Sequence, residues 1–199
     1  MADRRQIAAG LLKPLALNIP PERPEAVSTD RSDISTSPEK HYFSLMGLVR
    51  RIFRRKDLFS AAEKDQIVAA IKAAEQQTSG EVRVFVESRC KYVDPIDRAA
   101  EIFASLQMEK TAARNGTLVY VAIKDRQLAL WGDKGIHEKV GSAFWNKEVQ
   151  LILSHFYKAN YAEGIAKVVG EIGEALRTHF PYDRGTDVNE LPDDIVFGK

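Results

Sequence analysis

Residues 114–136, RNGTLVYVAIKDRQLALWGDKGI, decide the fold. Within them, residues 117–123 form an unbroken apolar and β-branched run. Such a run is typical of a strand that is covered on both faces at the centre of an α/β sheet. A polar turn follows at residues 124–126, and Leu128 and Leu130 then alternate with their neighbours. The two runs therefore predict an antiparallel hairpin.

Glycines stand at both ends of this hairpin. Asn115 and Gly116 precede the first strand, and Gly132 and Gly135 follow the second. Because a hairpin returns the chain to the place where it started, we expect both glycine segments to lie at one edge of the sheet. This edge is the candidate site.

A strand and a helix precede the hairpin. Residues 81–88 alternate valines with other side chains and predict a strand with one face better buried. Asp94 before Pro95 has the pattern of a helix start, with an N-cap and a proline in the first helical turn. The strand–helix–strand order predicts that residues 81–88 and 117–123 pair in parallel through a right-handed crossover. The start of the first strand then lies at the candidate edge as well.

Helical patterns surround this unit. Ser60 and Glu63 have the spacing of a capping box at the start of a helix that ends near residue 77. After the hairpin, three more helices are expected, at residues 136–144, 148–157 and 161–178. The order of elements predicts an α/β domain over residues 58–181.

The ends of the chain differ from this domain. Residues 1–45 predict a disordered extension, because they are rich in serine, threonine and proline. Residues 46–57 predict a basic amphipathic leader. Its charged run from Arg50 to Lys56 leaves peripheral membrane contact as an alternative, although we favour docking of its apolar residues on the domain. Residues 182–199 predict an acidic tail.

Composition narrows the classes of function. The 199 residues carry a net charge of +1, which favours neither nucleic-acid nor membrane binding by the molecule as a whole. No stretch reaches the roughly 18 apolar residues of a membrane span. The single cysteine suits a reducing compartment, and the N-terminus makes a poor signal peptide. We therefore expect a cytoplasmic protein.

Several familiar catalytic patterns are missing. Cys90 and Arg98 are eight positions apart, whereas a cysteine phosphatase places its cysteine and arginine six apart in an anion-binding loop. The four histidines have no paired spacing that would suit zinc. The sequence also contains neither a phosphate-binding P-loop nor the Gly-x-Gly-x-x-Gly pattern after a strand. We expect no organic cofactor.

Oxygen-bearing side chains gather at the glycine-lined edge. Glu81, Asn115 and Asp133 would meet there and could hold a hard divalent cation, calcium or magnesium. Gly132 and Gly135 lead into a helix whose first amide groups could receive an anion. The alternative is that each glycine serves a turn and each carboxylate caps a helix or remains solvated.

Three segments together carry a family resemblance. TSGEVRVFVES, RNGTLVYVAIKDRQLALWGDKGI and FYKANYAEGIAKVVGEIGEAL resemble the TPM domain family, and in particular its small soluble bacterial branch. The resemblance covers about residues 58–181. It implies a three-layer αβα sandwich with a small mixed central sheet. It also implies binding of a divalent cation, usually calcium, and the weak acid phosphatase activity of plant members. Many members carry a secretion signal and a membrane anchor, which we do not expect here.

Two functions follow from these observations. In the first, a bound cation polarises a phosphate monoester and activates water, while Arg114 or Lys134 stabilises the developing charge. In the second, the domain is a non-catalytic module that binds a protein partner. The positions of the carboxylates distinguish the two functions, because a metal-dependent enzyme needs at least two carboxylates that converge near an open coordination position.

Overall fold

A computed structural model describes residues 58–90, 94–182 and 194–198. The N-terminal extension, the basic leader and residues 183–193 of the tail lie outside the described residues, so the expectations for them stay predictions. The described elements are α3 (Ala61–Glu75), β1 (Val82–Glu87), α4 (Pro95–Ser105), the short 3-10 helix η1 (Met108–Lys110), β2 (Thr117–Ala122), β3 (Gln127–Gly132), α5 (Lys134–Phe156), α6 (Tyr161–His179) and β4 (Ile195–Phe197).

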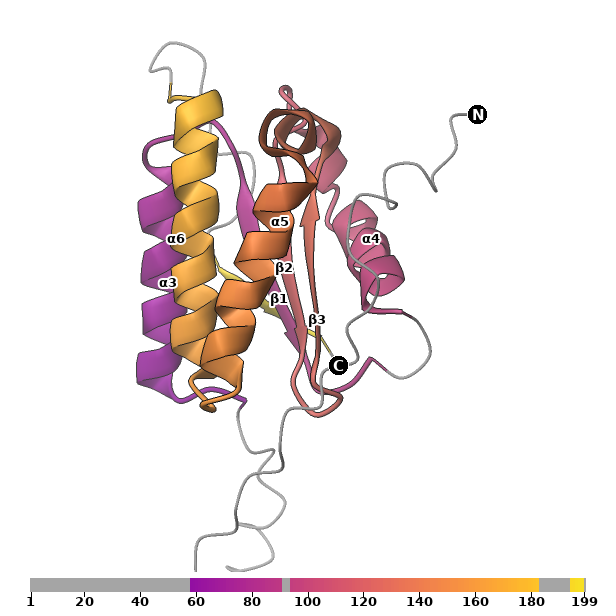
Figure 1. Ribbon diagram of the computed structural model, residues 1–199, viewed down its shortest axis with the longest axis vertical. Coiled ribbons are helices and arrows are strands. Elements are labelled where there is room, and N and C mark those ends of the chain that lie inside the picture. Colours follow the sequence, from indigo (N-terminus) through magenta and orange to yellow (C-terminus); the bar gives the residue numbers. More distant parts are fainter. Residues whose placement is uncertain (1–57, 91–93, 183–193, 199) are drawn as a thin grey trace, which may run out of the picture. The chain divides into compact units, whose positions relative to one another are not determined.

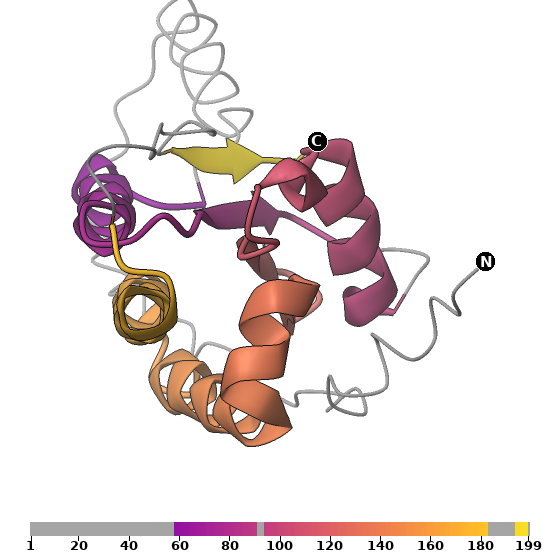
Figure 2. The same cartoon turned by 90° about the horizontal axis from the view of Figure 1, so that it is seen from above.

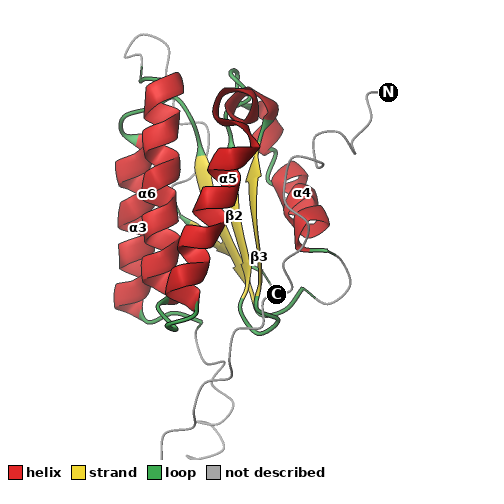
Figure 3. Cartoon of the chain, in the orientation of Figure 1, coloured by secondary structure: helices red, strands yellow, loops and turns green. Residues whose placement is uncertain are grey.

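The four strands form one mixed sheet in the order β3-β2-β1-β4 (Figures 1 and 3). β1 pairs in parallel with β2, and Val82 lies opposite Thr117. β2 pairs antiparallel with β3, and Thr117 lies opposite Gly132. Both the parallel pair and the hairpin that the sequence predicts are therefore confirmed.

Helices cover both faces of the sheet (Figure 2). α4 packs on β2 and β3 from one side, which we call the outer face. α3, α6 and α5 lie against the other side, which we call the inner face. The described domain is thus the three-layer αβα sandwich that the resemblance implies. Within the described residues, no helix has both the length and the apolar character needed to cross a membrane.

Local signals in the sequence explain where two helices begin. At α3, the Ser60 amide donates to the Glu63 carboxylate at 2.7 Å, and the Glu63 amide donates to the Ser60 hydroxyl at 3.3 Å. At α4, the amide of Ile96 donates to the Asp94 carboxylate at 2.8 Å. Each cap uses amide groups that have no partner inside the helix. Both predicted helix starts are confirmed.

Three features differ from expectation. β4 lies in the segment that the sequence analysis treated as an acidic tail, yet it pairs in parallel with β1. β1 therefore lies between two strands, and because helices cover both faces of the sheet, all six of its residues are buried, whereas we expected one face to be better buried than the other. Two helices are expected at residues 136–144 and 148–157, and α5 indeed consists of two helical segments, but they meet at a kink at Gly141, whose φ of 69° is positive, so the break lies earlier than expected.

Candidate functional site

The glycine segments meet at one edge of the sheet, where β1 and β2 begin and β3 ends. We call this edge the rim. The amide of Thr117 donates to the Glu81 carbonyl at 2.7 Å, and the amide of Asp133 donates to the Gly116 carbonyl at 2.9 Å. The side-chain amide of Asn115 reaches the Ser79 carbonyl at 3.1 Å. These bonds join all three segments that the sequence analysis expects at this edge.

The sheet separates the side chains of the rim into two groups, and glycines show which residue faces which side. Side chains of α6 and α5, Leu176 and Trp145, occupy the places of the missing Cβ atoms of Gly80 and Gly132, so these glycines face the inner side. The place above Gly116 holds a main-chain oxygen and a side chain from the outer layer. Since neighbouring residues of a strand face opposite sides, Glu81 and Asp133 lie on the outer side and Asn115 lies on the inner side.

Asp133 is buried and its carboxylate is already engaged within the chain. Oδ1 accepts the amide of Lys134 at 2.7 Å and so caps α5. Arg114 forms two bonds to the same carboxylate, from Nε to Oδ2 at 2.5 Å and from Nη2 to Oδ1 at 2.8 Å. The bond to Asp133 raises the pKa of the Arg114 guanidinium. Asp133 therefore caps a helix and anchors a half-exposed arginine.

The backbone around Arg114 is shaped for this contact. Arg114 has a left-handed φ of 53°, which non-glycine residues rarely adopt. Its carbonyl accepts the amide of Gly135 at 2.8 Å. A side chain at Gly135 would collide with the carbonyl oxygens of Ala113 and Arg114, so glycine is required for this close approach.

The predicted anion-binding glycines have these structural roles. Gly132 leaves space for the Trp145 ring, and Gly135 gives its amide to a carbonyl. Lys134 uses its amide in the cap, and its exposed ammonium lies 3.7 Å from Glu138. Anion binding by the two glycines and a catalytic role for Lys134 stay predictions.

The outer side of the rim holds a row of oxygen atoms. Glu81 and Asp133 are each 5% exposed and lie on either side of Gly116. Two interstrand spacings separate their Cα atoms, or about 10 Å. The carbonyl oxygen of Met108 lies above Gly116, 2.9 Å from the place of its missing Cβ. Two carboxylates and a carbonyl thus face the same side.

This row is a modest donor set for a metal. In the described ranges, no group of three or more histidine, cysteine, aspartate or glutamate residues is arranged to hold a metal ion. A hard cation can nevertheless complete its coordination with carbonyl oxygens and water. Glu81, Asp133 and Met108 are therefore the residues of the rim that could hold one together.

Asn115 is placed apart from that row. It is 1% exposed, and its backbone amide donates to the Thr111 hydroxyl at 3.2 Å. Its Oδ1 accepts no hydrogen bond from any described residue. The structure uses the Asn115 side chain to tie β2 to the segment before β1, and its role as a metal ligand stays a prediction.

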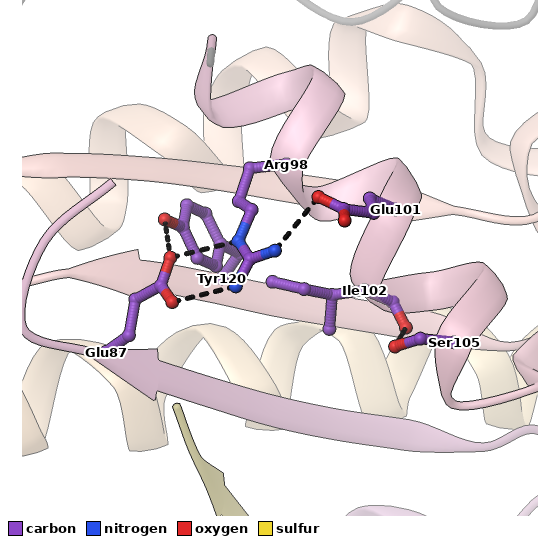
Figure 4. Close-up of polar contacts among 6 residues, drawn as sticks. All are labelled: Glu87, Arg98, Glu101, Ile102, Ser105 and Tyr120. Carbon is purple, nitrogen blue, oxygen red and sulfur yellow. Dashed lines mark hydrogen bonds and ion pairs between the residues drawn. The ribbon is translucent and has the colours of Figure 1, made fainter. Parts of the chain in front are cut away.

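A second polar cluster lies at the opposite end of β1 (Figure 4). Glu87 accepts two bonds from Arg98, at 3.1 and 3.0 Å, and one from the Tyr120 hydroxyl at 2.6 Å. Arg98 also binds Glu101 at 2.9 Å. The bond to Glu87 raises the pKa of Arg98, and burial raises the pKa of Tyr120 with help from Cys90 and Glu87. Arg98 thus ties α4 to the sheet.

Sequence reasoning missed Glu148 on α5. It is fully buried, and neither carboxylate oxygen has a hydrogen-bond partner among the described residues. The ammonium of Lys147 lies 3.2 Å from Oε1. Burial raises the pKa of Glu148, and Lys147 opposes that change. Its position three residues after Trp145 and four before Ile152 puts it on the apolar face of the helix, a signal that the sequence already contains.

Comparisons with known proteins place this geometry in context. Residues 52–175 match the family model of the TPM domain. The NMR structure of the BA42 protein from the psychrophilic bacterium Bizionia argentinensis is similar, with 36% identity, a TM-score of 0.67 and coverage of 73% of this chain and 99% of that chain. The N-terminal domain of cg2496 from Corynebacterium glutamicum has 17% identity, a TM-score of 0.48 and coverage of 74% and 89%. Among curated proteins, none matches.

Proposed function

Because the chain belongs to the TPM domain family, we propose that it binds a divalent cation, calcium or magnesium, on the outer side of the rim. One observation carries the proposal: two buried carboxylates, Glu81 and Asp133, lie on the same side of the sheet with the Met108 carbonyl between their strands. Oxygen atoms of these types are the ligands that hard cations prefer.

Arg114 neutralises the charge of Asp133 when no cation is bound. Its guanidinium holds Asp133, but half of its side chain is exposed to solvent, so it can leave without disturbing the core. A divalent cation that approaches Asp133 therefore competes with Arg114 for the same oxygens. The cap on α5 needs only one hydrogen-bond acceptor and can persist when the cation is bound.

Displacement of Arg114 connects cation binding to phosphate chemistry. Once released from Asp133, the Arg114 guanidinium carries N–H donors that match the oxygens of a phosphoryl group. Lys134, the residue after Asp133, supplies a second positive charge. The bound cation would polarise the phosphoryl oxygen and activate water. Hydrolysis of a phosphate monoester is thus the reaction proposed for this site.

A different observation favours the second function, a non-catalytic protein-interaction module. Asp133 caps α5 and pairs with Arg114, so both of its oxygens have a structural use without any metal. If that is their whole role, the rim is a rigid end of the sheet that a protein partner can bind. The experiment below separates the two functions.

The test is thermal unfolding of the full chain with and without millimolar calcium or magnesium. A cation that binds only the folded state at 100 times its Kd adds about 2.7 kcal/mol, or roughly 5–10 °C in Tm. Asp133→Asn keeps a good helix cap and removes the charge, so the shift should disappear. Arg114→Gln removes the competitor, so the shift should grow.

Arg89→Gln is the matched control, because this exposed arginine pairs with Asp125 at the other end of the sheet. Its cation response should equal that of the unaltered chain. No shift at millimolar calcium or magnesium, or the same shift in Asp133→Asn, would reject the cation site and favour the interaction module. A confirmed shift justifies phosphatase assays on the same variants.

A further inference from the structure

Arg83 is a largely buried cation that has no side-chain partner among the described residues. Only 6% of its surface is exposed, and its Nε is buried with no hydrogen-bond partner. Across the described ranges, Arg83 forms neither an ion pair nor a hydrogen bond through its side chain. Nε is the buried, unpaired atom of the guanidinium, so the Nη atoms remain accessible to solvent. An anion is the usual partner of a partly buried guanidinium, and a small ligand could supply it.

Strand geometry places Arg83 next to the proposed cation site. Phe85 belongs to the apolar cluster under α4, so Arg83, two residues earlier on β1, faces the same outer side. Glu81 is two residues earlier again, and its Cα lies about 7 Å away along the strand. Arg83 thus belongs to the row of residues directly inside the row of rim oxygens.

We propose that Arg83 binds a phosphate-type oxyanion beside the rim cation. The inference deepens the proposed function and rests on it for the cation, whereas the contact between the anion and Arg83 has its own test. A guanidinium presents parallel N–H donors that match two oxygens of a phosphate, and burial strengthens such a charge-assisted contact. The anion would lie between Arg83 and a cation held by Glu81.

The surroundings of Arg83 restrict what can bind. Because only 6% of the Arg83 surface is exposed, its ligand would have to be a compact anion, either free phosphate or the terminal phosphoryl group of a monoester. The carboxylates of Glu81 and Asp133 would repel such an anion while the cation is absent. Phosphate and cation should therefore strengthen each other's binding by the same factor, as linked ligands must.

The alternative is that Arg83 has no ligand. A long side chain can bury its methylene groups against apolar neighbours and direct only its charged end to water. In that case, Arg83→Met would leave any response to phosphate unchanged. The variant also removes a buried charge, which is often neutral or stabilising, so the domain should still fold.

The experiment measures Tm and calorimetric binding for the full chain with inorganic phosphate or phenyl phosphate, each with and without calcium. We expect phosphate to bind the unaltered chain more tightly in calcium. Arg83→Met should weaken phosphate binding by about tenfold or more while keeping the Tm shift caused by calcium alone. Arg83→Lys, which keeps the charge but loses the paired donors, should be intermediate.

Arg89→Met is the control, because it removes an exposed arginine far from the rim and should leave phosphate binding unchanged. Binding of both ligands would identify a site for phosphoryl groups in general, and binding of inorganic phosphate alone would restrict it to the free ion. Equal phosphate binding by Arg83→Met and the unaltered chain, or none by the unaltered chain in calcium, would overturn the proposal. Failure of the cation site is detected separately, because the unaltered chain would then show no Tm shift in calcium without phosphate.

Discussion

Asp133 combines an observed structural role with the cation-binding role that we propose for it. Its carboxylate caps α5, binds Arg114 and lies at the rim, all within one buried side chain. Truncation to alanine would remove the cap together with the charge and would confuse folding with binding. Asparagine separates the two, because it caps a helix about as well as aspartate but provides no charge for a cation.

Glu148 gives a residue-scale prediction that concerns stability. Burial raises the pKa of its carboxyl group in the folded chain. The folded state therefore holds its proton more tightly than the unfolded state, whose carboxyl titrates near pH 4.3, roughly. Stability is fully present below that pH and decreases as the pH rises through the folded pKa.

Glu148→Met should remove this loss, because an apolar side chain of similar length replaces a buried charge. At pH 7.5 we expect the variant to be more stable by about 1–4 kcal/mol, and at pH 4 the difference should shrink. Urea unfolding followed by tryptophan fluorescence at both pH values measures it. Glu174→Gln, which alters an exposed carboxylate of α6 that pairs with Arg177, is the control. A variant less stable than the unaltered chain at pH 7.5 would contradict the argument.

At the scale of elements, the contact between α4 and the sheet depends on a buried ion pair. Arg98 places two nitrogens on Glu87, and Tyr120 adds its hydroxyl from β2 (Figure 4). Removal of one partner of a buried pair leaves an uncompensated charge. Arg98→Met should therefore destabilise the domain by about 3 kcal/mol in chemical denaturation.

The double variant Glu87→Gln with Arg98→Met tests the cause. Because no charge is left unpaired, it should recover a large part of the lost stability, and the coupling energy follows from the double-mutant cycle. Arg98→Met alone keeps Glu101 in place, and that carboxylate is exposed, so its loss of a partner should cost little. Additive losses in the double variant would mean that Glu87 and Arg98 do not act as a pair.

Elements with strong local signals could be predicted from the sequence. The capping residues Ser60 and Asp94 and the apolar run of β2 each contain the physical cause of their structure within a few residues. β4 could not be found in this way, because three residues form a strand only through pairing with β1. The break in α5 is expected between residues 144 and 148 but lies at Gly141, since a glycine inside a helix pattern does not reveal a positive φ.

The candidate site was predictable in position but not in its side-chain geometry. Hairpin topology brings Asn115 and Asp133 to one rim, and the parallel pairing of β1 with β2 brings Glu81 there as well. Their assignment to faces depends on strand register, and a shift by one residue would exchange the faces. Whether Arg83 finds a partner depends on which side chains surround it in space, and the sequence alone does not specify those neighbours; in the described part of the chain it has none.

At the scale of the whole molecule, β4 joins the end of the chain to the sheet. It pairs with the edge of β1 that faces away from β2, and the amide of Gly198 donates to the Val86 carbonyl at 2.9 Å. Ile195 is buried, so loss of the strand exposes apolar surface as well as backbone groups. A chain that ends at residue 193 should lose about 2–4 kcal/mol and aggregate more readily.

Thermal unfolding and light scattering measure these two effects. Phe197→Ser is the matched control, because this side chain is 44% exposed and its removal leaves the strand pairing intact. Its cost should stay at about 1 kcal/mol, because the ring loses only its contact with the Lys64 ammonium, 5.5 Å from the ring centroid, and part of its burial. An equal Tm for the shortened chain would show that β1 needs no neighbour on that edge. The expected loss would instead show that the C-terminal residues belong to the folded domain. They would then also support the candidate site, because β4 pairs with β1, and β1 carries Arg83 and begins at the rim.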